Sequence, residues 1–198
     1  MSAPMNSQGF FLTHDYYLSP SWFSRLHSHF DFCLDIDLFA SRLHHHLPRY
    51  SSRLPDPGAE FIDSFSLPWS GNNYLFPPIV LLSRVINKFI TDNCQFSLLI
   101  VPFLPSSPVF PSILDLCIAP PILLPDCAVI REPRHCKVSQ MMAWTISVSV
   151  SLQEDFRRTL SPDCSVMWKK NPYRNINLTG RNLPVGVTKG KLMLTTYL

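Results

Sequence analysis

Short apolar runs alternate with amphipathic stretches over roughly the first two thirds of the chain. An apolar face at helical spacing, opened by Pro20, predicts a helix over about residues 20–30. The next run, 32–39, is apolar apart from Asp35 and Asp37, and it predicts a strand. We expect both acidic side chains to lie near the carboxyl end of that strand.

The same alternation continues to about residue 118. It predicts a turn or short helix over 42–49, a loop over 51–59, a short strand over 61–63, a turn at 72–73, a strand over 74–76, a helix over 79–90, a buried strand over 96–101 and a helix over 110–118. Helices and strands in alternation are typical of an α/β fold, here a small, open, mostly parallel sheet with flanking helices. Ligands of such sheets bind beyond the carboxyl ends of the strands.

The pattern fades beyond about residue 120. We therefore predict a flexible tail over 1–17, one α/β domain over 18–125, and a linker-like, largely irregular segment over 126–198 with a disordered C-terminal tail. Within that last segment, only 143–146 and 152–160 have the pattern of ordered elements.

Proline and charge content modify this picture. The chain has 19 prolines in 198 residues, about twice the usual share of roughly 5%, and only 16% charged residues. Prolines break helices and central strands, so long elements are excluded. They also interrupt the most apolar span, 96–125, which therefore does not predict a membrane helix. This composition fits a fragment of a larger protein or a decayed one.

Charge and cysteine usage narrow the class of protein. The net charge of +3 is too small to indicate nucleic-acid binding by itself. The six cysteines lack paired short spacings, and the N-terminus lacks the apolar run of a signal peptide. We expect an intracellular protein with reduced cysteines, without a membrane anchor and without an identified protein partner.

Two groups of side chains are candidates for chemistry. Asp35 and Asp37 could hold polar groups of S-adenosylmethionine at a strand end; as alternatives, they are solvated or pair with Arg42. The run His44 to His46 invites comparison with a metal site, but three consecutive residues point in different directions and do not converge on one ion. We therefore predict no metal site.

The amino-acid sequence from about residue 18 to residue 153 resembles that of a known family. The phrases that carry the resemblance are Asp37-Leu38-Phe39-Ala40-Ser41-Arg42-Leu43, Leu47-Pro48-Arg49-Tyr50, Pro55-Asp56-Pro57-Gly58-Ala59, Asp63 to Trp69, Tyr74 to Pro78, Leu82 to Ile90, Ile100-Val101-Pro102 and Met142-Ala143-Trp144. In this order they resemble the segment of DIRS-type retrotransposon polyproteins between RNase H and the tyrosine recombinase. More distantly, they resemble phage-type DNA adenine methyltransferases. The resemblance implies a methyltransferase-like fold, with nucleic acid as partner in an intact element.

Departures from the family weigh against catalysis. Amino methyltransferases carry Asp or Asn before the proline pair and an aromatic residue after it, where this chain has Phe76-Pro77-Pro78-Ile79. Phe76 cannot accept a hydrogen bond from an amino group, and Ile79 cannot stack on an extruded base. The resemblance therefore implies a degenerate site, no catalytic activity and no cofactor. The alternatives are a surviving S-adenosylmethionine-dependent DNA adenine methyltransferase, and a short interaction protein or unselected reading frame.

Other departures concern the core. The family has Trp where this chain has Arg53, Leu104 and Val109, and Asn where it has His44. Losing a buried Trp costs several kcal/mol, about 3–5. We therefore expect an underpacked core and marginal stability.

Overall fold

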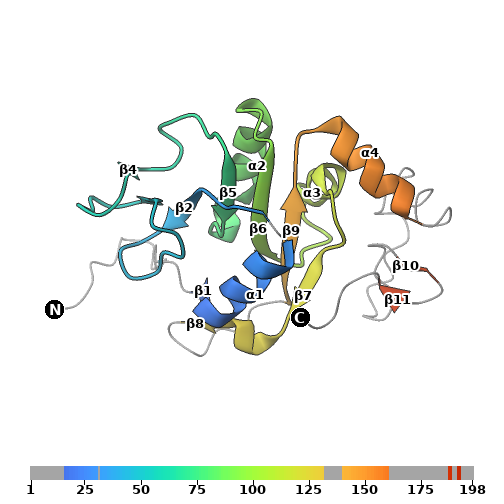
Figure 1. Cartoon of the computed structure of the whole chain (residues 1–198), viewed down its shortest axis with the longest axis horizontal. Coiled ribbons are helices and arrows are strands. Elements are labelled where there is room, and N and C mark those ends of the chain that lie inside the picture. Colours follow the sequence, from blue (N-terminus) through green and yellow to red (C-terminus); the bar gives the residue numbers. More distant parts are fainter. Residues whose placement is uncertain (1–15, 31, 132–139, 161–186, 189–190, 193–198) are drawn as a thin grey trace.

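The computed structural model describes residues 16–30, 32–131, 140–160, 187–188 and 191–192 (Figure 1). The elements are β1 (Tyr16–Leu18), α1 (Pro20–Phe30), β2 (Ile36–Ala40), β3 (Tyr50–Ser52), β4 (Phe61–Ile62), β5 (Asn72–Leu75), the 3-10 turn η1 (Ile79–Leu81), α2 (Leu82–Thr91), β6 (Phe96–Pro102), α3 (Phe110–Leu116), β7 (Ile122–Leu124), the 3-10 turn η2 (Asp126–Ala128), β8 (Val129–Arg131), β9 (Met141–Ile146), α4 (Val150–Thr159), β10 (Val187–Thr188) and β11 (Lys191–Leu192). The predicted tail over 1–17, apart from its end in β1, and most of the predicted disordered C-terminal segment lie outside the described residues.

Seven of the described strands form one mixed sheet in the order β4-β3-β2-β5-β6-β9-β7. The neighbouring pairs from β4 to β6 are all parallel, whereas β9 runs antiparallel to both β6 and β7. Along the chain, β2, β3 and β4 extend the sheet in one direction, and β5 and β6 then extend it in the other. The direction in which successive strands are added to the sheet therefore reverses between β2 and β5. The prediction of an α/β fold is confirmed.

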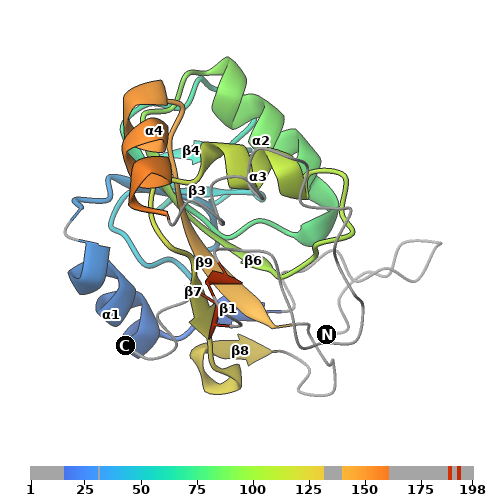
Figure 2. The ribbon, with the colours of Figure 1, turned by 90° about the vertical axis from the view of Figure 1, so that its right-hand side faces the viewer.

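Both faces of the sheet are covered. Figure 2 shows α2, α3 and α4 above the sheet, and α1 with the antiparallel pair β1–β8 below it. Successive side chains of a strand point to opposite faces of the sheet and belong to two different apolar clusters. In β6, for example, Leu99 packs with α2 and α3, while Leu98 packs with α1 and β1. All seven residues of β6 are buried, as expected for a strand at the centre of a sheet that helices cover on both sides.

The strands that correspond to the predicted runs 32–39, 74–76 and 96–101 are neighbours in the sheet. β2, β5 and β6 are adjacent and parallel, and the helix predicted over 79–90 packs on them as η1 and α2. Leu82, Val85, Ile86 and Phe89 are buried on its inner face at helical spacing, whereas Val80 before it is 88% exposed. The prolines after β5 end that strand, because proline cannot donate to the ladder.

Three local predictions differ from the structure. The turn predicted at 72–73 is the start of β5, because Asn72 pairs with Phe96 and Asn73 with both Ile36 and Ser97. Within the loop predicted over 51–59, residues 51 and 52 belong to β3. Beyond the domain end predicted at 125, the chain returns to the sheet as β9, between β6 and β7, and all six residues of β9 are buried. In all three cases, pairing with strands that are distant in sequence determines the structure of the segment. Local turn and loop propensities do not predict such pairing.

The apolar span 96–125 divides into β6, α3 and β7, with loops between them. In the part of the chain that the structure describes, no helix has both the length and the apolar character needed to cross a membrane.

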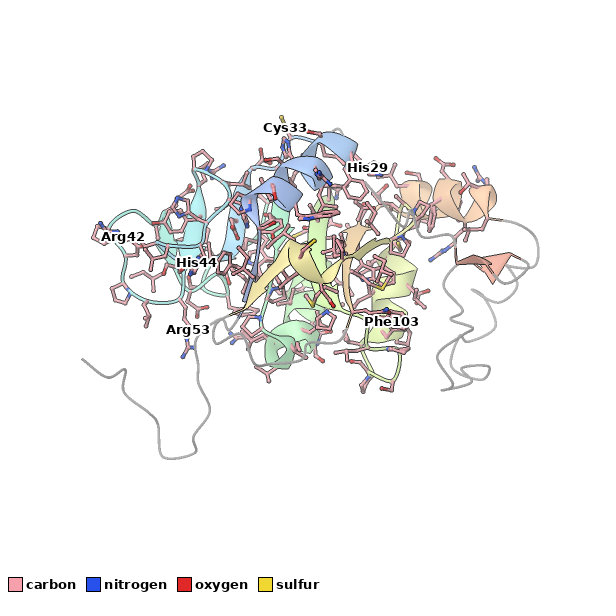
Figure 3. The ribbon with its side chains drawn as sticks, turned by 90° about the horizontal axis from the view of Figure 1, so that it is seen from below. His29, Cys33, Arg42, His44, Arg53 and Phe103 are labelled. Carbon is pink, nitrogen blue, oxygen red and sulfur yellow. The ribbon has the colours of Figure 1, made fainter. Side chains whose placement is uncertain are left out.

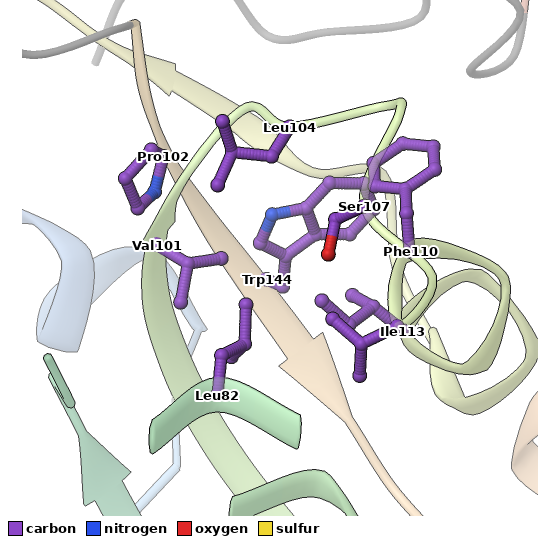
Figure 4. Close-up of a pocket in the computed structure, with 9 residues that line it drawn as sticks. Leu82, Val101, Pro102, Leu104, Ser107, Phe110, Ile113 and Trp144 are labelled. Carbon is purple, nitrogen blue, oxygen red and sulfur yellow. The ribbon is translucent and has the colours of Figure 1, made fainter. Parts of the chain in front are cut away.

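A small apolar cavity lies beyond the carboxyl end of β6. The side chains of Leu82, Leu104 and Ile113 surround the indole ring of Trp144 there (Figure 4). The cavity volume is about 10 Å³, at the lower limit for one water molecule. Leu104 and Val109, two of the three positions at which the departures from the resembled sequences were noted, both line it. Marginal stability stays a prediction, and the third position, Arg53, is exposed and not part of the core.

Candidate functional site

The reversal between β2 and β5 places one pocket at the edge where open α/β sheets bind ligands. The pocket is on the α1 side of the sheet, near the carboxyl ends of the two strands. Its lining residues are Tyr17, Asp37, Phe39, His44, His46, Tyr74 and Phe76. Its volume is about 20 Å³, enough for about one water molecule. All but one of these residues carry a ring, so aromatic groups form most of the wall.

Asp37 is the acidic group of this pocket. It is the second residue of β2 and lies opposite Tyr50 and Tyr74 in register. Only 1% of the residue is exposed. The carboxylate accepts two long backbone hydrogen bonds, from the N–H of Phe39 at 3.3 Å and from that of His46 at 3.2 Å. Among the described residues, no basic side chain pairs with it, and the interaction with Arg42 considered from the sequence is not formed.

Burial raises the pKa of Asp37 to about 7, and the two backbone N–H groups only partly oppose this effect. A strongly raised carboxyl pKa in a pocket is a common sign of a functional site, although structural burial produces it too. The group is therefore part protonated and part ionised near neutral pH.

Tyr74 is the second unusual polar group. The residue is 1% exposed, and its hydroxyl group has no hydrogen-bond partner among the described residues. Burial, and next the nearby Asp37 charge, raise its pKa well above the usual value. A buried hydroxyl without a partner typically costs about 1–3 kcal/mol, so a partner from outside the described residues would stabilise it.

The three consecutive histidines contact three different aromatic partners. His44 stacks on Tyr17 with ring centroids 3.9 Å apart, His45 on Tyr50 at 4.3 Å, and His46 on Phe23 at 4.5 Å. The prediction that all three point in different directions is confirmed only in part, because His44 and His46 both line the pocket whereas His45 does not. Burial, opposed by a hydrogen bond to the backbone of Leu18, lowers the pKa of His46 to about 4, so its ring is neutral at physiological pH. In the part of the chain that the structure describes, no cluster of three His, Cys, Asp or Glu side chains is placed to hold a metal ion.

The placement of Asp35 differs from the prediction. It precedes β2, at the amino end of the strand rather than the carboxyl end. Its backbone N–H donates to the carbonyl of Asn72, and its carboxylate accepts from the N–H of Asn72, both at 2.7 Å. A Cβ on Gly71, which has φ +72°, would collide with this carboxylate. Asp35 therefore holds the turn before β5, and the structure does not bring it together with Asp37.

The residues of the proline motif divide between core and surface. Phe76 and Pro77 are buried, and Phe76 lines the pocket beside Asp37. Pro78 is half-buried and precedes η1, and Ile79 is 40% exposed at the start of that turn. Only Phe76 of the four therefore contributes to the pocket.

Trp69 and Tyr74, the aromatic residues near the motif, belong to opposite faces of the sheet. Trp69 is packed in the cluster with α2, and its indole N–H donates to the carbonyl of Ser64 at 2.6 Å. Tyr74 is in the cluster with α1 and meets Phe23 edge-on. Neither ring presents an open face on which a base could stack.

Sequence reasoning identified Asp37 and Phe76 but missed the pocket partners Tyr17, Tyr74 and His46. These come from β1, β5 and the loop after β2, and no local spacing links them. Comparison of the chain with protein-family models, with curated proteins and with solved structures gave no match.

Proposed function

We propose that this chain is a non-catalytic α/β domain derived from a retrotransposon polyprotein, with a methyltransferase-like sheet whose ligand cleft is filled. The observation that carries the proposal is the pocket at the strand reversal. It lies where an open sheet binds its ligand, and side chains leave room in it for about one water molecule.

The strand arrangement supports the methyltransferase-like fold. Parallel strands that reverse their order beside β2 are typical of doubly wound sheets. The antiparallel β9, inserted between β6 and β7, distinguishes methyltransferase sheets from dinucleotide-binding ones. Fold alone does not imply activity, however, so the activity has to be argued from the pocket.

The pocket supports the absence of cofactor binding. Sites for ligands as large as S-adenosylmethionine usually enclose about 300–1,000 Å³, far more than the roughly 20 Å³ here. After β2, the chain contains no glycine before Gly58, so side chains fill the space where a backbone would otherwise approach a ligand. Phe76 then fills the position of the acceptor for the amino group.

In an intact element, the domain would be a spacer or a nucleic-acid-facing module between RNase H and the recombinase. The ordered phrases in the sequence support this origin. The exposed Arg42 and Arg53 lie at the same end of the molecule as His44 (Figure 3), which supplies basic side chains on that side.

One observation favours the alternative of an S-adenosylmethionine-dependent DNA adenine methyltransferase. Asp37 is a buried carboxylate at the strand reversal, next to the proline motif, and could accept a hydrogen bond from an amino group. This alternative requires the aromatic wall to open widely, and it leaves the missing stacking residue at position 79 unexplained.

A radiolabelled methyl-transfer assay on double- and single-stranded DNA tests the proposal. We expect no label in adenine above the level without protein, because nothing positions the amino group or holds the extruded base. The matched control is Asp37→Ala, which removes the one buried carboxylate of the pocket. Label that enters adenine with the natural chain and is lost in this variant would establish the enzyme instead.

A further inference from the structure

We propose that the pocket beside Asp37 binds a compact ammonium group, either the ammonium ion or the tip of a primary amine. The inference does not depend on the proposed polyprotein origin. It rests on the unsatisfied polar atoms of the pocket, the nature of its walls and its size.

The first argument is the hydrogen-bonding capacity of Asp37. An ionised carboxylate has about four acceptor sites, and the described residues use two of them through long backbone bonds. No cation of the described residues offsets the charge. A buried carboxylate with neither a charge partner nor a full set of donors is costly, and a guest with several N–H groups supplies both.

The second argument is independent and concerns Tyr74. Its hydroxyl group is buried without a partner, and Tyr74 is paired with Asp37 across β2 and β5 on the same side of the sheet. Both side chains line the pocket. A donor-rich guest between them can donate to the carboxylate and to the phenol oxygen together, which would satisfy both groups.

The third argument concerns the walls. The rings of Tyr17, Phe39, His44, His46 and Phe76 complete the lining. Aromatic faces attract cations, most strongly where water is excluded. Because the pKa of His46 is low, its ring carries no charge that would repel a cation near neutral pH. The aromatic residues of the wall are therefore compatible with a cation as guest.

Size then restricts the chemistry. About 20 Å³ admits one non-hydrogen atom with its hydrogens, which fits ammonium or the terminal –NH₃⁺ group of a primary amine and excludes a nucleobase. A divalent metal ion is disfavoured because the described residues supply no cluster of three suitable ligands. Tyr17 and His44, both half-buried, form the part of the wall that a longer amine would pass.

The test is an NMR titration of the ¹³C-labelled Asp37 carboxyl group of the full chain, at equal ionic strength in sodium, potassium and ammonium chloride. A bound cation favours the ionised form, so ammonium should lower the pKa of Asp37. The pKa of Asp37 should fall by about one pH unit when the ammonium concentration is ten times the dissociation constant. Sodium should have no effect.

Titrations with two other cations and with one variant show which kind of cation the pocket binds. Butylammonium lowers the pKa as ammonium does if the pocket accepts an amine tip, and has no effect if it accepts only the free ion. Tetramethylammonium, which lacks donors and is too large, should have no effect. Tyr74→Phe, which keeps the ring, should weaken the ammonium effect several-fold. Equal pKa values of Asp37 in all the salts, or an ammonium effect unchanged in Tyr74→Phe, would overturn the proposal.

Discussion

Replacing Asp37 by Asn should stabilise the protein at pH 8 by about 3–4 kcal/mol and leave its stability nearly unchanged at pH 4. The folded-state pKa of Asp37, about 7, lies above the ordinary value of 3.8. The folded state therefore binds this proton more tightly than the unfolded state. The contribution to stability is fully present below about pH 4 and is lost as pH rises to about 7. Three pH units correspond to about 4 kcal/mol.

His46 changes the pH profile in the opposite sense. Burial lowers its pKa from 6.5 to about 4, so its contribution is present above pH 6.5 and is lost as pH falls through 4. The two effects oppose each other between pH 4 and 6.5 in the natural chain. In Asp37→Asn only the His46 effect remains, and stability should rise with pH over that range.

Urea unfolding followed by tryptophan fluorescence at pH 4, 6 and 8 measures both effects. Asp115→Asn is the matched control, because the Asp115 side chain is 71% exposed and its contact with Arg157 is long, at 3.7 Å. We expect it to change the free energy of unfolding by less than about 0.5 kcal/mol at every pH. Parallel pH profiles for the natural chain and Asp37→Asn would show that the carboxyl group is not destabilised by burial.

Cutting the chain after Pro125 should abolish cooperative folding. The cut removes β9, which pairs with β6 through six residues on one side and with β7 on the other. It exposes the full length of β6 and removes Trp144, 1% exposed, from the cluster beneath α2 and α3. Near-UV circular dichroism and urea unfolding of a chain that ends at residue 125 should show no tertiary signal and no sharp transition.

A point substitution tests the same packing without a deletion. Trp144→Ala should cost about 3–5 kcal/mol, typical for a large buried aromatic side chain. Trp144→Phe should cost less, because it also removes an indole N–H that has no partner among the described residues. Leu152→Ala in α4, at a position 46% exposed, is the control and should cost less than about 1 kcal/mol. Equal, small losses in all three variants would place β9 outside the cooperative unit.

Local patterns were sufficient for the central part of the fold. The apolar run of β6 and the helical spacing of the apolar residues of α2 are local patterns in the sequence, and β5 and β6 are neighbours both along the chain and in the sheet. The pairing of β9 was not predictable in this way. About 40 residues separate it from β6, and polar residues flank its apolar run on both sides.

The candidate site was only partly predictable for a related reason. An error of a few residues in the bounds of β2 was enough to place Asp35 at the wrong end of the strand. The sequence identified Asp37 as a candidate, but Asp37 is the second of the five residues of β2 and does not lie at the carboxyl end, where it was predicted. Its burial and its pairing with Tyr74 depend on how β1, β2 and β5 come together, which no spacing along the chain expresses.

The central claim is that the cleft at the strand reversal is filled, and equilibrium dialysis of the full chain with radiolabelled S-adenosylmethionine tests it most directly. Because side chains occupy the pocket, we predict that the retained label equals that of an unrelated protein at the same concentration. Asp37→Ala should give the same value as the natural chain. Saturable binding by the natural chain that disappears in Asp37→Ala would contradict the account and show that the pocket opens to admit the cofactor.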